Sequence, residues 1–331
     1  MSGTQDQDSE TLRDWDAYWQ NAGLAPALRD GGPQDEALDR FWSDLLDRAL
    51  ARTGESSRLL DVASGNGAVV RFALRSAERL GAGARLVITA LDGSHSALAE
   101  LRRRHPGIRC VVADAVRAPF PDGAFDVVTS QFGLEYAGQA ALPEAARLVA
   151  PGGVFAAILH LRQGGIFREC AANLEAIEGF RASGLLPRFD EVYRAAWAVK
   201  QSAGTIDAVR EADRGLAISV RNCEETLRKF GREVASGTLL RIYRDVGHMH
   251  ARLGAYDPAE MTAWIDNMGR ELDSYSGRMA SMLEAALDAD QVARASRELT
   301  EAGFSIRLGG VLKFGHPPVP CAWAIVADRP R

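Results

Sequence analysis

The chain has 331 residues, a formal net charge of −5, 47% hydrophobic residues and 25% charged residues. This composition is typical of a globular protein with one large domain or two medium ones. The acidic balance disfavours a general nucleic-acid or membrane-surface binder, because such proteins carry a basic field. No apolar run reaches the ~18 residues that span a bilayer, and the polar N-terminus lacks a signal-peptide pattern. With four widely spaced cysteines, these features predict a cytoplasmic protein without a disulfide framework or zinc site.

The apolar pattern divides the chain into an N-terminal segment, an interrupted core and a helical insertion. Residues 1–34 are expected to be disordered or to form a lid. The core, residues 35–160 and 296–331, begins with an amphipathic helix and continues with short apolar runs that alternate with helix-length segments. Residues 161–295 show helical periodicity without a strand pattern, and they are too many for a loop, so they predict a helical insertion.

Five apolar runs before the insertion and two after it predict a seven-stranded sheet. Most runs do not alternate with polar residues, which indicates burial on both faces and therefore parallel strands covered by helices. A short Pro-rich turn joins the last two runs, so the final strand is expected to be antiparallel. The pattern predicts an α/β fold with a doubly wound, Rossmann-like sheet. The expected strands are 58–63, 85–92, 108–114, 125–131, 154–160, 304–314 and 321–328.

The strongest local signal is the run Leu59-Leu-Asp-Val-Ala-Ser-Gly-Asn-Gly-Ala68. The strand in this run ends near Asp61, and Gly65 and Gly67 then let the backbone turn tightly and approach a ligand. The helix that starts next offers free N–H groups to a carboxylate or phosphate. A dinucleotide site would place a third glycine where Val70 stands, and this side chain closes the space for a pyrophosphate.

The glycine turn resembles motif I of the class I S-adenosylmethionine-dependent methyltransferases, D-x-G-x-G-x-G, with Ala63 at the first glycine. Further segments resemble the small-molecule branch of this family, and they follow in the same order along the chain. They are Thr89–Ser94, Val112–Ala115, Pro119–Val128, Glu144–Leu148, Leu148–Val154 and Glu301–Phe304. The resemblance covers residues 35–160 and 295–328. It implies the methyltransferase fold, with S-adenosyl-L-methionine as cofactor and S-adenosyl-L-homocysteine as product.

The resemblance also implies roles for individual acids. Asp92 would accept hydrogen bonds from both ribose hydroxyls, and Asp114 would accept one from the adenine amino group. Alone, Asp92 could be a helix N-cap and Asp114 a turn residue. With Asp61, however, they end three consecutive strands, at the edge where open α/β sheets bind ligands. The expected cofactor-binding residues are Asp61, Ala63, Ser64, Gly65, Gly67, Asp92, Gly93, Ser94, Asp114, Ala115, Gln131 and Phe132, and no metal ligands are expected.

His160 and Glu135 are the candidate catalytic residues. His160 ends the fifth strand on the ligand edge, where it could act as a general base or simply bond to neighbouring backbone. Glu135 and Tyr136 follow the fourth strand, where the family's loop faces the acceptor. A loop glutamate is more often solvated than catalytic, and Tyr136 could equally be part of the core.

Two further segments leave alternatives open. Trp15, Tyr18 and Trp19 precede the core, and they either cover the cofactor's sulfonium as a lid or anchor the N-terminus. The insertion at 161–295 either caps the acceptor site or pairs with a second copy of the chain in a homodimer. His248 and His250 are expected to be surface residues rather than metal ligands.

The sequence therefore predicts an enzyme that transfers a methyl group from S-adenosylmethionine to a small-molecule N, O or C nucleophile by in-line displacement. Two alternatives remain, an RNA or protein methyltransferase and a non-catalytic S-adenosylmethionine-binding subunit. The acidic charge and the absence of an N/D-P-P-Y/F tetrapeptide after the fourth strand disfavour nucleic acid as a partner. The expected partner is a small-molecule acceptor, whose identity does not follow from the sequence.

Overall fold

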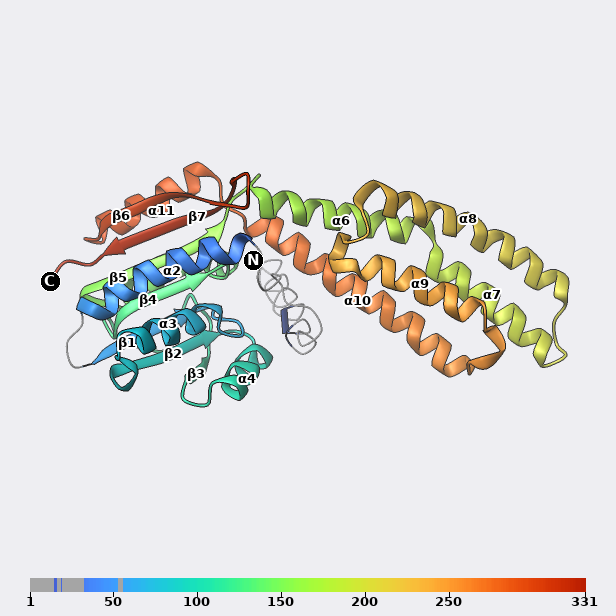
Figure 1. Cartoon of the computed structure of the whole chain (residues 1–331), viewed down its shortest axis with the longest axis horizontal. Coiled ribbons are helices and arrows are strands. Elements are labelled where there is room, and N and C mark those ends of the chain that lie inside the picture. Colours follow the sequence, from blue (N-terminus) through green and yellow to red (C-terminus); the bar gives the residue numbers. More distant parts are fainter. Residues whose placement is uncertain (1–14, 17–18, 20–32, 53–55) are drawn as a thin grey trace. The chain divides into compact units, whose positions relative to one another are not determined.

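The computed structural model describes residues 15–16, 19, 33–52 and 56–331, and these form two compact units (Figure 1). The sheet unit comprises the described residues up to Arg168 together with Ser281–Arg331. The helical unit is Glu169–Ala280. The expected insertion of 161–295 is longer than the helical unit at both ends, because residues 161–168 and 281–295 belong to the sheet unit.

The sheet unit is built on seven strands in the order β3-β2-β1-β4-β5-β7-β6. Strands β1 to β5 pair in parallel, and β7 runs antiparallel to both of its neighbours. This topology confirms the predicted doubly wound α/β sheet with an antiparallel last strand. The bounds are β1 Ser57–Val62, β2 Leu86–Asp92, β3 Arg109–Val112, β4 Phe125–Gln131, β5 Val149–His160, β6 Ser305–Phe314 and β7 Val319–Asp328.

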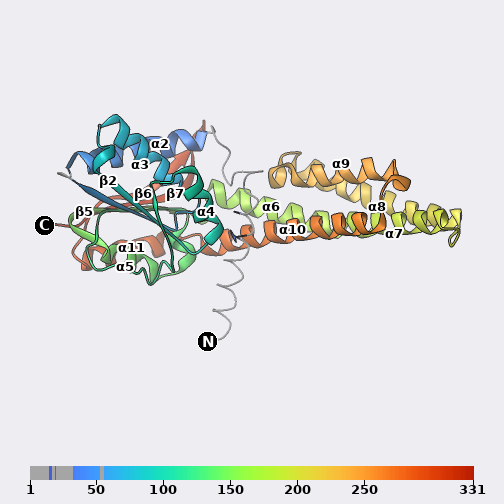
Figure 2. The ribbon, with the colours of Figure 1, turned by 90° about the horizontal axis from the view of Figure 1, so that it is seen from below.

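Helices cover both faces of the sheet. Figure 2 shows α2 and α3 on one side and α5 and α11 on the other. The bounds are α2 Pro33–Arg52, α3 Ala68–Arg79, α4 His95–Arg104, α5 Ala141–Arg147 and α11 Ala289–Glu301, with 3₁₀ turns η1 Gly83–Arg85 and η2 Leu134–Ala137. Val292 and Leu299 of α11 are buried in the core of the sheet unit. Because of this packing, α11 belongs to the sheet unit, although its first residues fall within the expected insertion.

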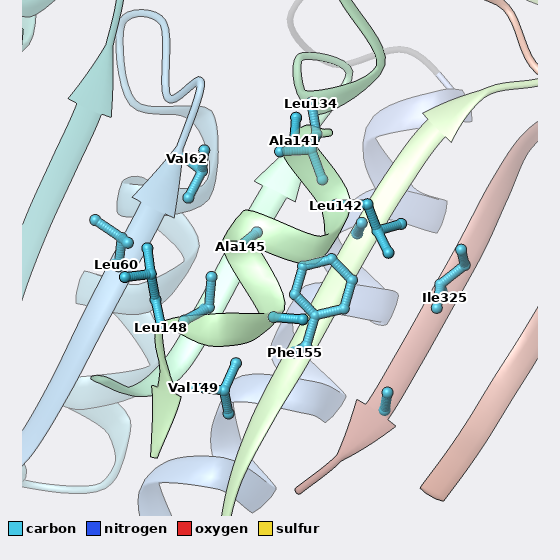
Figure 3. Packing of buried hydrophobic residues seen from close by; sticks show 14 of the residues in the cluster. Leu60, Val62, Leu134, Ala141, Leu142, Ala145, Leu148, Val149, Phe155 and Ile325 are labelled. Carbon is cyan, nitrogen blue, oxygen red and sulfur yellow. The ribbon is translucent and has the colours of Figure 1, made fainter. Parts of the chain in front are cut away.

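A large apolar cluster of the sheet unit includes the sheet face beneath α5. Figure 3 shows Leu60 and Val62 of β1 and Phe155 of β5 among these packed side chains. Since side chains alternate along a strand, Asp61 faces the opposite layer, which is formed by α2 and α3. The parallel register aligns Asp61 with Thr129 of β4. Burial of one face thus determines which face each polar residue at the strand ends occupies.

The chain leaves the sheet after β5 and returns beside the same point. The Leu287 N–H donates to the carbonyl of His160 at 2.9 Å, and the Arg162 N–H donates to the carbonyl of Leu287 at 2.9 Å. Leu161 and Leu287 form an isolated parallel bridge. The segments that precede and follow the insertion are therefore hydrogen-bonded to each other.

The helical unit has an apolar core of its own, to which Phe180, Phe189, Leu239 and Ile242 contribute fully buried side chains. Its helices are α6 Gly165–Ser183, α7 Leu185–Lys200, α8 Ile206–Phe230, α9 Thr238–His250 and α10 Pro258–Ala285, with 3₁₀ turns η3 Val234–Gly237 and η4 Leu253–Ala255. The first residues of α6 and the last of α10 belong to the sheet unit. No helix in the described part of the chain is long and apolar enough to cross a membrane.

One turn of the helical unit has an unusual backbone. Ala235 and Ser236 in η3 both adopt left-handed φ values, of 50° and 54°. The backbone N–H of Ala235 donates to the side-chain oxygen of Asn173 at 2.9 Å, and Asn173 is buried. This hydrogen bond from α6 satisfies a buried donor in a turn that L-residues rarely adopt.

Candidate functional site

The loops after β1 and β2 are tied together at the carboxyl edge of the sheet. The backbone N–H of Ser64 donates to the carbonyl of Leu91 at 3.1 Å, and the N–H of Gly65 donates to Oδ2 of Asp92 at 2.8 Å. Gly67 is the N-cap of α3 with a φ of 91°, and a methyl group there would lie 2.4 Å from Cδ1 of Leu101. The turn therefore requires glycine for both its conformation and its close packing.

Ala63 stands where the family motif has its first glycine, and its φ is 52°. This left-handed conformation is easy for glycine and strained for alanine, so the backbone here keeps the shape that the motif prescribes. Ser64, next in the chain, is buried, and its hydroxyl has no hydrogen-bond partner among the described residues.

Asp61 is buried at the end of β1 with 1% of its surface exposed. Its Oδ1 accepts a hydrogen bond from the Thr129 hydroxyl at 2.9 Å, whereas Oδ2 has no partner in the described part of the chain. Burial raises the pKa of Asp61 to about 8, and the nearby Asp92 carboxylate adds to the rise against the effect of the Thr129 bond. A buried acceptor without a partner is suited to a cationic ligand group.

Asp92 ends β2 and accepts two backbone hydrogen bonds, from Gly65 to Oδ2 and from Ser94 to Oδ1 at 2.7 Å. Burial raises its pKa despite these bonds. The N-cap of α4 is Ser94, whose hydroxyl accepts from the N–H of Ala97. Asp92 is therefore not the N-cap of this helix, which was the alternative that the sequence left open. Gly93 between them is exposed. Asp92 is thus held rigidly at the strand end expected for the ribose.

Asp114 lies on the loop after β3 and is exposed, while Ala115 is buried. Its Oδ1 accepts from the Val116 N–H at 3.0 Å, which is the turn role that the sequence offered as an alternative. The preceding residue, Ala113, donates its N–H to the carbonyl of Asp92 at 3.1 Å. The structure therefore places the Asp114 loop beside the end of β2, but it gives Asp114 no contact with Asp61 or Asp92.

Gln131 and Phe132 end β4 and begin the next loop. Oε1 of Gln131 accepts a hydrogen bond from the indole N–H of Trp42 at 2.6 Å. The sequence marked Trp42 only as one apolar position of an amphipathic helix, and a contact across 89 residues leaves no local signal. Phe132 has a φ of 53°, and its ring centroid lies 4.5 Å from that of His160. Phe132 therefore packs against the candidate base.

His160 and Glu135 form a buried pair. Nδ1 of His160 lies 2.6 Å from Oε1 of Glu135, and the same oxygen accepts the backbone N–H of His160 at 2.8 Å. The Glu135 side chain is 0% exposed, and its Oε2 has no hydrogen-bond partner among the described residues. Tyr136 places its ring edge-on to the imidazole at 5.8 Å. The glutamate is thus the partner for His160 that the sequence did not reveal.

One short stretch of the N-terminal segment contacts three of the site's loops. Trp15 packs edge-on against Tyr136 with centroids 5.6 Å apart. Oδ1 of Asp16 accepts from the Ser94 hydroxyl at 2.7 Å and from the N–H of Ser96 at 3.1 Å. Trp19 lies over Gly65, where an added methyl group would be 2.9 Å from its ring. The sequence analysis did not identify Asp16 or Ser96, and Tyr18 lies outside the described residues.

The residues at this edge fit S-adenosylmethionine. Asp61 Oδ2 and Ser64 Oγ are buried without hydrogen-bond partners in the described ranges, so two polar atoms near the glycine turn are available to a ligand. The glycine turn provides close backbone approach, and Asp92 provides a carboxylate at the next strand end. A metal is not needed to explain this donor set, and no group of potential metal ligands occurs among the described residues.

Comparisons with known proteins agree with this interpretation. Residues 60–157 match the family model described as a methyltransferase domain. The chain is similar to a demethylmenaquinone methyltransferase from Beutenbergia cavernae, with 40% identity over 119 residues, which are 35% of this chain and 45% of that protein. A ubiquinone/menaquinone biosynthesis C-methyltransferase from Roseobacter denitrificans is 36% identical over 125 residues, 35% of this chain and 47% of that protein. The chain thus spans about half the length of these relatives.

The chain superposes only weakly on solved structures. A structure of an amino pentose methyltransferase from Micromonospora echinaspora with bound S-adenosylmethionine shares 29% identity, with a TM-score of 0.30 over 39% of this chain and 51% of that one. The similarity to methyltransferases is therefore carried by the matched segment, residues 60–157, and not by the overall superposition. Residues 60–157 of the chain thus match a methyltransferase domain, and they lie in the part of the sheet unit that carries the glycine turn and the strand-end acids.

Proposed function

We propose that the protein transfers a methyl group from S-adenosylmethionine to a small-molecule acceptor whose nucleophile loses a proton to His160. The observation that carries this proposal is the buried Glu135–His160 pair at the carboxyl end of β5. A histidine oriented by a carboxylate is the arrangement that general-base catalysis uses. A subunit that only bound the cofactor would not require it.

S-adenosylmethionine supplies, when bound, an electrophilic methyl group on a positively charged sulfur. On the protein side, Asp92 holds the ribose hydroxyls. Asp61 and Ser64 bind the amino-acid end through their unpaired oxygens. The neighbouring glycine turn keeps these groups close to the ligand because it has no side chains at its tightest positions.

His160 acts as the base through its second ring nitrogen. The Glu135 carboxylate accepts the Nδ1–H, which fixes the tautomer and leaves the lone pair on Nε2. A proton taken from the acceptor moves to Nε2, and the buried carboxylate stabilises the resulting imidazolium. Phe132 and Tyr136 pack against the imidazole and keep water from it.

The acceptor class follows from the same residues. A base is required when the nucleophilic position must first lose a proton, as in a ring hydroxyl or a carbon activated by one. The rings of Phe132 and Tyr136 near His160 favour a planar, aromatic acceptor. The relatives' names specify demethylmenaquinone and ubiquinone/menaquinone biosynthesis, and a quinone becomes such a hydroxylated ring when it is reduced to its quinol.

The test is methyl transfer from radiolabelled S-adenosylmethionine to demethylmenaquinone reduced to its quinol and to a panel of naphthols and phenols, with RNA and protein as separate acceptors. His160→Gln is expected to lower the rate about 10²–10⁴-fold without weakening cofactor binding. His250→Gln is the matched control, because His250 also pairs with a carboxylate, Asp213 at 2.7 Å, but in the helical unit. Transfer to RNA or protein alone, or cofactor binding without any transfer, would contradict the proposal.

A further inference from the structure

Trp42 of α2 contacts the site through one specific hydrogen bond. Its side chain is fully buried, and its indole N–H lies 2.6 Å from Oε1 of Gln131, the last residue of β4. An indole N–H can only donate, so the oxygen of the Gln131 amide must face it. This contact therefore identifies which end of the Gln131 side-chain amide is the oxygen and which is the NH₂ group.

The assignment leaves the NH₂ end of Gln131 as a hydrogen-bond donor. Gln131 is half-buried, and its NH₂ group donates to no other residue in the described ranges. Rotating the amide by half a turn would bring NH₂ against the indole N–H, and two donors repel. Trp42 therefore holds the Gln131 amide in one of its two orientations, in which the NH₂ group points away from the indole and can donate a hydrogen bond to a ligand.

Gln131 and Asp61 share one face of the sheet. Asp61 aligns with Thr129 across the β1–β4 pair, and their side chains are hydrogen-bonded at 2.9 Å. Gln131 is two residues beyond Thr129 on the same strand, so its side chain projects on the same face. A donor at the end of β4 thus lies on the same sheet face as Asp61 Oδ2, a buried atom without a partner among the described residues.

A hydrogen-bond donor and a carboxyl group on one sheet face match an α-amino-acid head group, which has a carboxylate and an ammonium on one carbon, and the ammonium favours the ionised form of Asp61. We propose that Gln131 binds the carboxylate of the cofactor's methionine portion, and that Trp42 is the positioning residue that turns the Gln131 amide toward it. The inference rests on the proposed function, because it takes S-adenosylmethionine as the ligand. It assigns Asp61 to the ammonium of the same head group.

The experiment compares two ligands by calorimetry, S-adenosylhomocysteine and 5′-methylthioadenosine. The second has the same nucleoside and a thioether but no amino-acid head. The variants are Trp42→Phe, Gln131→Glu and Gln131→Met, together with the double variant of Trp42→Phe and Gln131→Met. Gln131→Glu keeps an oxygen for the indole and replaces the NH₂ donor by a second oxygen. Tyr243→Phe is the matched control, since it removes a 2.6 Å hydrogen bond to Glu224 in the helical unit.

We expect Trp42→Phe and Gln131→Glu to weaken binding of S-adenosylhomocysteine by about tenfold or more, which corresponds to the loss of one good hydrogen bond to a charged group. Both variants should leave 5′-methylthioadenosine binding within about twofold, a change of less than half a kcal/mol. Trp42→Phe should add less than about twofold on top of Gln131→Met, because the indole then has no amide to orient. Tyr243→Phe should change neither affinity.

Two results would overturn the inference. Equal weakening of both ligands would mean that Trp42 only supports the packing of the site, and unchanged binding of S-adenosylhomocysteine would mean that Gln131 does not contact the head group. If Trp42→Phe fails to fold, the two Gln131 variants decide the question alone, since Gln131 is only half-buried. Failure of the unaltered protein to bind either ligand would instead refute the proposed function and this inference with it.

Discussion

Ala63 and Gly133 interlock the loop after β1 with the loop after β4. A methyl group on Gly133 would lie 2.5 Å from Cβ of Ala63 and 2.8 Å from its carbonyl oxygen. The methyl group of Ala63 is therefore accommodated because residue 133 has none. The first loop carries the glycine turn and the second leads to Glu135, so this contact joins the part of the site proposed to bind the cofactor with the part proposed to hold the base.

Gly133→Ala should destabilise the protein by about 1–3 kcal/mol, because the new methyl group overpacks a backbone contact. Adding Ala63→Gly should restore only part of the loss, since the carbonyl oxygen of residue 63 stays 2.8 Å away. Urea unfolding of the two single variants and the double variant measures the coupling. A Gly133→Ala protein as stable as the unaltered chain would refute the interlock.

Asp61 should make stability depend on pH. Its folded-state pKa of about 8 is above the ordinary 3.8, so the folded state binds the proton more tightly than the unfolded state. The contribution is therefore complete below about pH 4 and is lost as the pH rises through 8, with a slope of at most about 1.4 kcal/mol per pH unit. Unfolding of the protein and of Asp61→Asn between pH 5 and 9 should differ by this slope. Parallel curves would contradict the assignment.

Asp61 is also expected to release a proton when the cofactor binds. At pH 7 Asp61 is mostly protonated, and an ammonium placed against it favours the ionised form. Binding of S-adenosylhomocysteine should thus release up to one proton and strengthen between pH 6 and 8. Calorimetry in buffers with different ionisation enthalpies measures the release, and Asp61→Asn should abolish it. A release that persists in Asp61→Asn would identify another group as its source.

Asp16 should stabilise the N-terminus of α4. Its carboxylate accepts from Ser94 and from both the backbone and the hydroxyl of Ser96, next to the positive end of the helix dipole. Asp16→Ala is expected to cost about 1–2 kcal/mol in thermal or urea unfolding. Asp39→Ala is the comparison, because Asp39 forms only an exposed ion pair with Arg75, which is worth about 0–1 kcal/mol. Equal losses in the two variants would argue against a stabilising role of Asp16 at the N-terminus of α4.

Asn173 should be required for the left-handed turn of the helical unit. Asn173→Ala leaves the buried N–H of Ala235 unpaired, which is expected to cost about 1–3 kcal/mol of stability. Exposed Asn222 on α8 offers a control, since Asn222→Ala should change stability by less than about 0.5 kcal/mol. Chemical unfolding of both proteins measures the difference. An Asn173→Ala protein that unfolds like the control would mean that the turn does not depend on this bond.

The strand ends could be predicted from sequence because they depend on local patterns. The buried runs and the glycine turn placed Asp61, Asp92 and His160 at the carboxyl edge, since parallel strands share that edge. Ala63 was also recognised as a departure from the motif, and the structure adds that it keeps a left-handed backbone. The first residues of α11 lie within the expected insertion of 161–295 but pack in the sheet unit, because amphipathic periodicity alone does not distinguish the core that a helix packs against.

The partners of the site residues could not be predicted in the same way. Glu135 reaches His160 across 25 residues, Trp42 reaches Gln131 across 89, and Asp16 reaches Ser94 across 78. Each contact depends on the tertiary arrangement of loops and helices, and none leaves a spacing pattern along the chain. A loop glutamate such as Glu135 is usually solvated, so its burial could be learned only from the structure.

The hydrogen bonds between Leu287 and the backbone of His160 and Arg162 have an evolutionary consequence. They close the base of the insertion, so the two ends of whatever is inserted are held together by the sheet unit itself. Replacement of the inserted helices by a shorter or different module would leave the strand order untouched. A chain of this design can therefore change the length of its insertion without losing the pairing of β5 with β7.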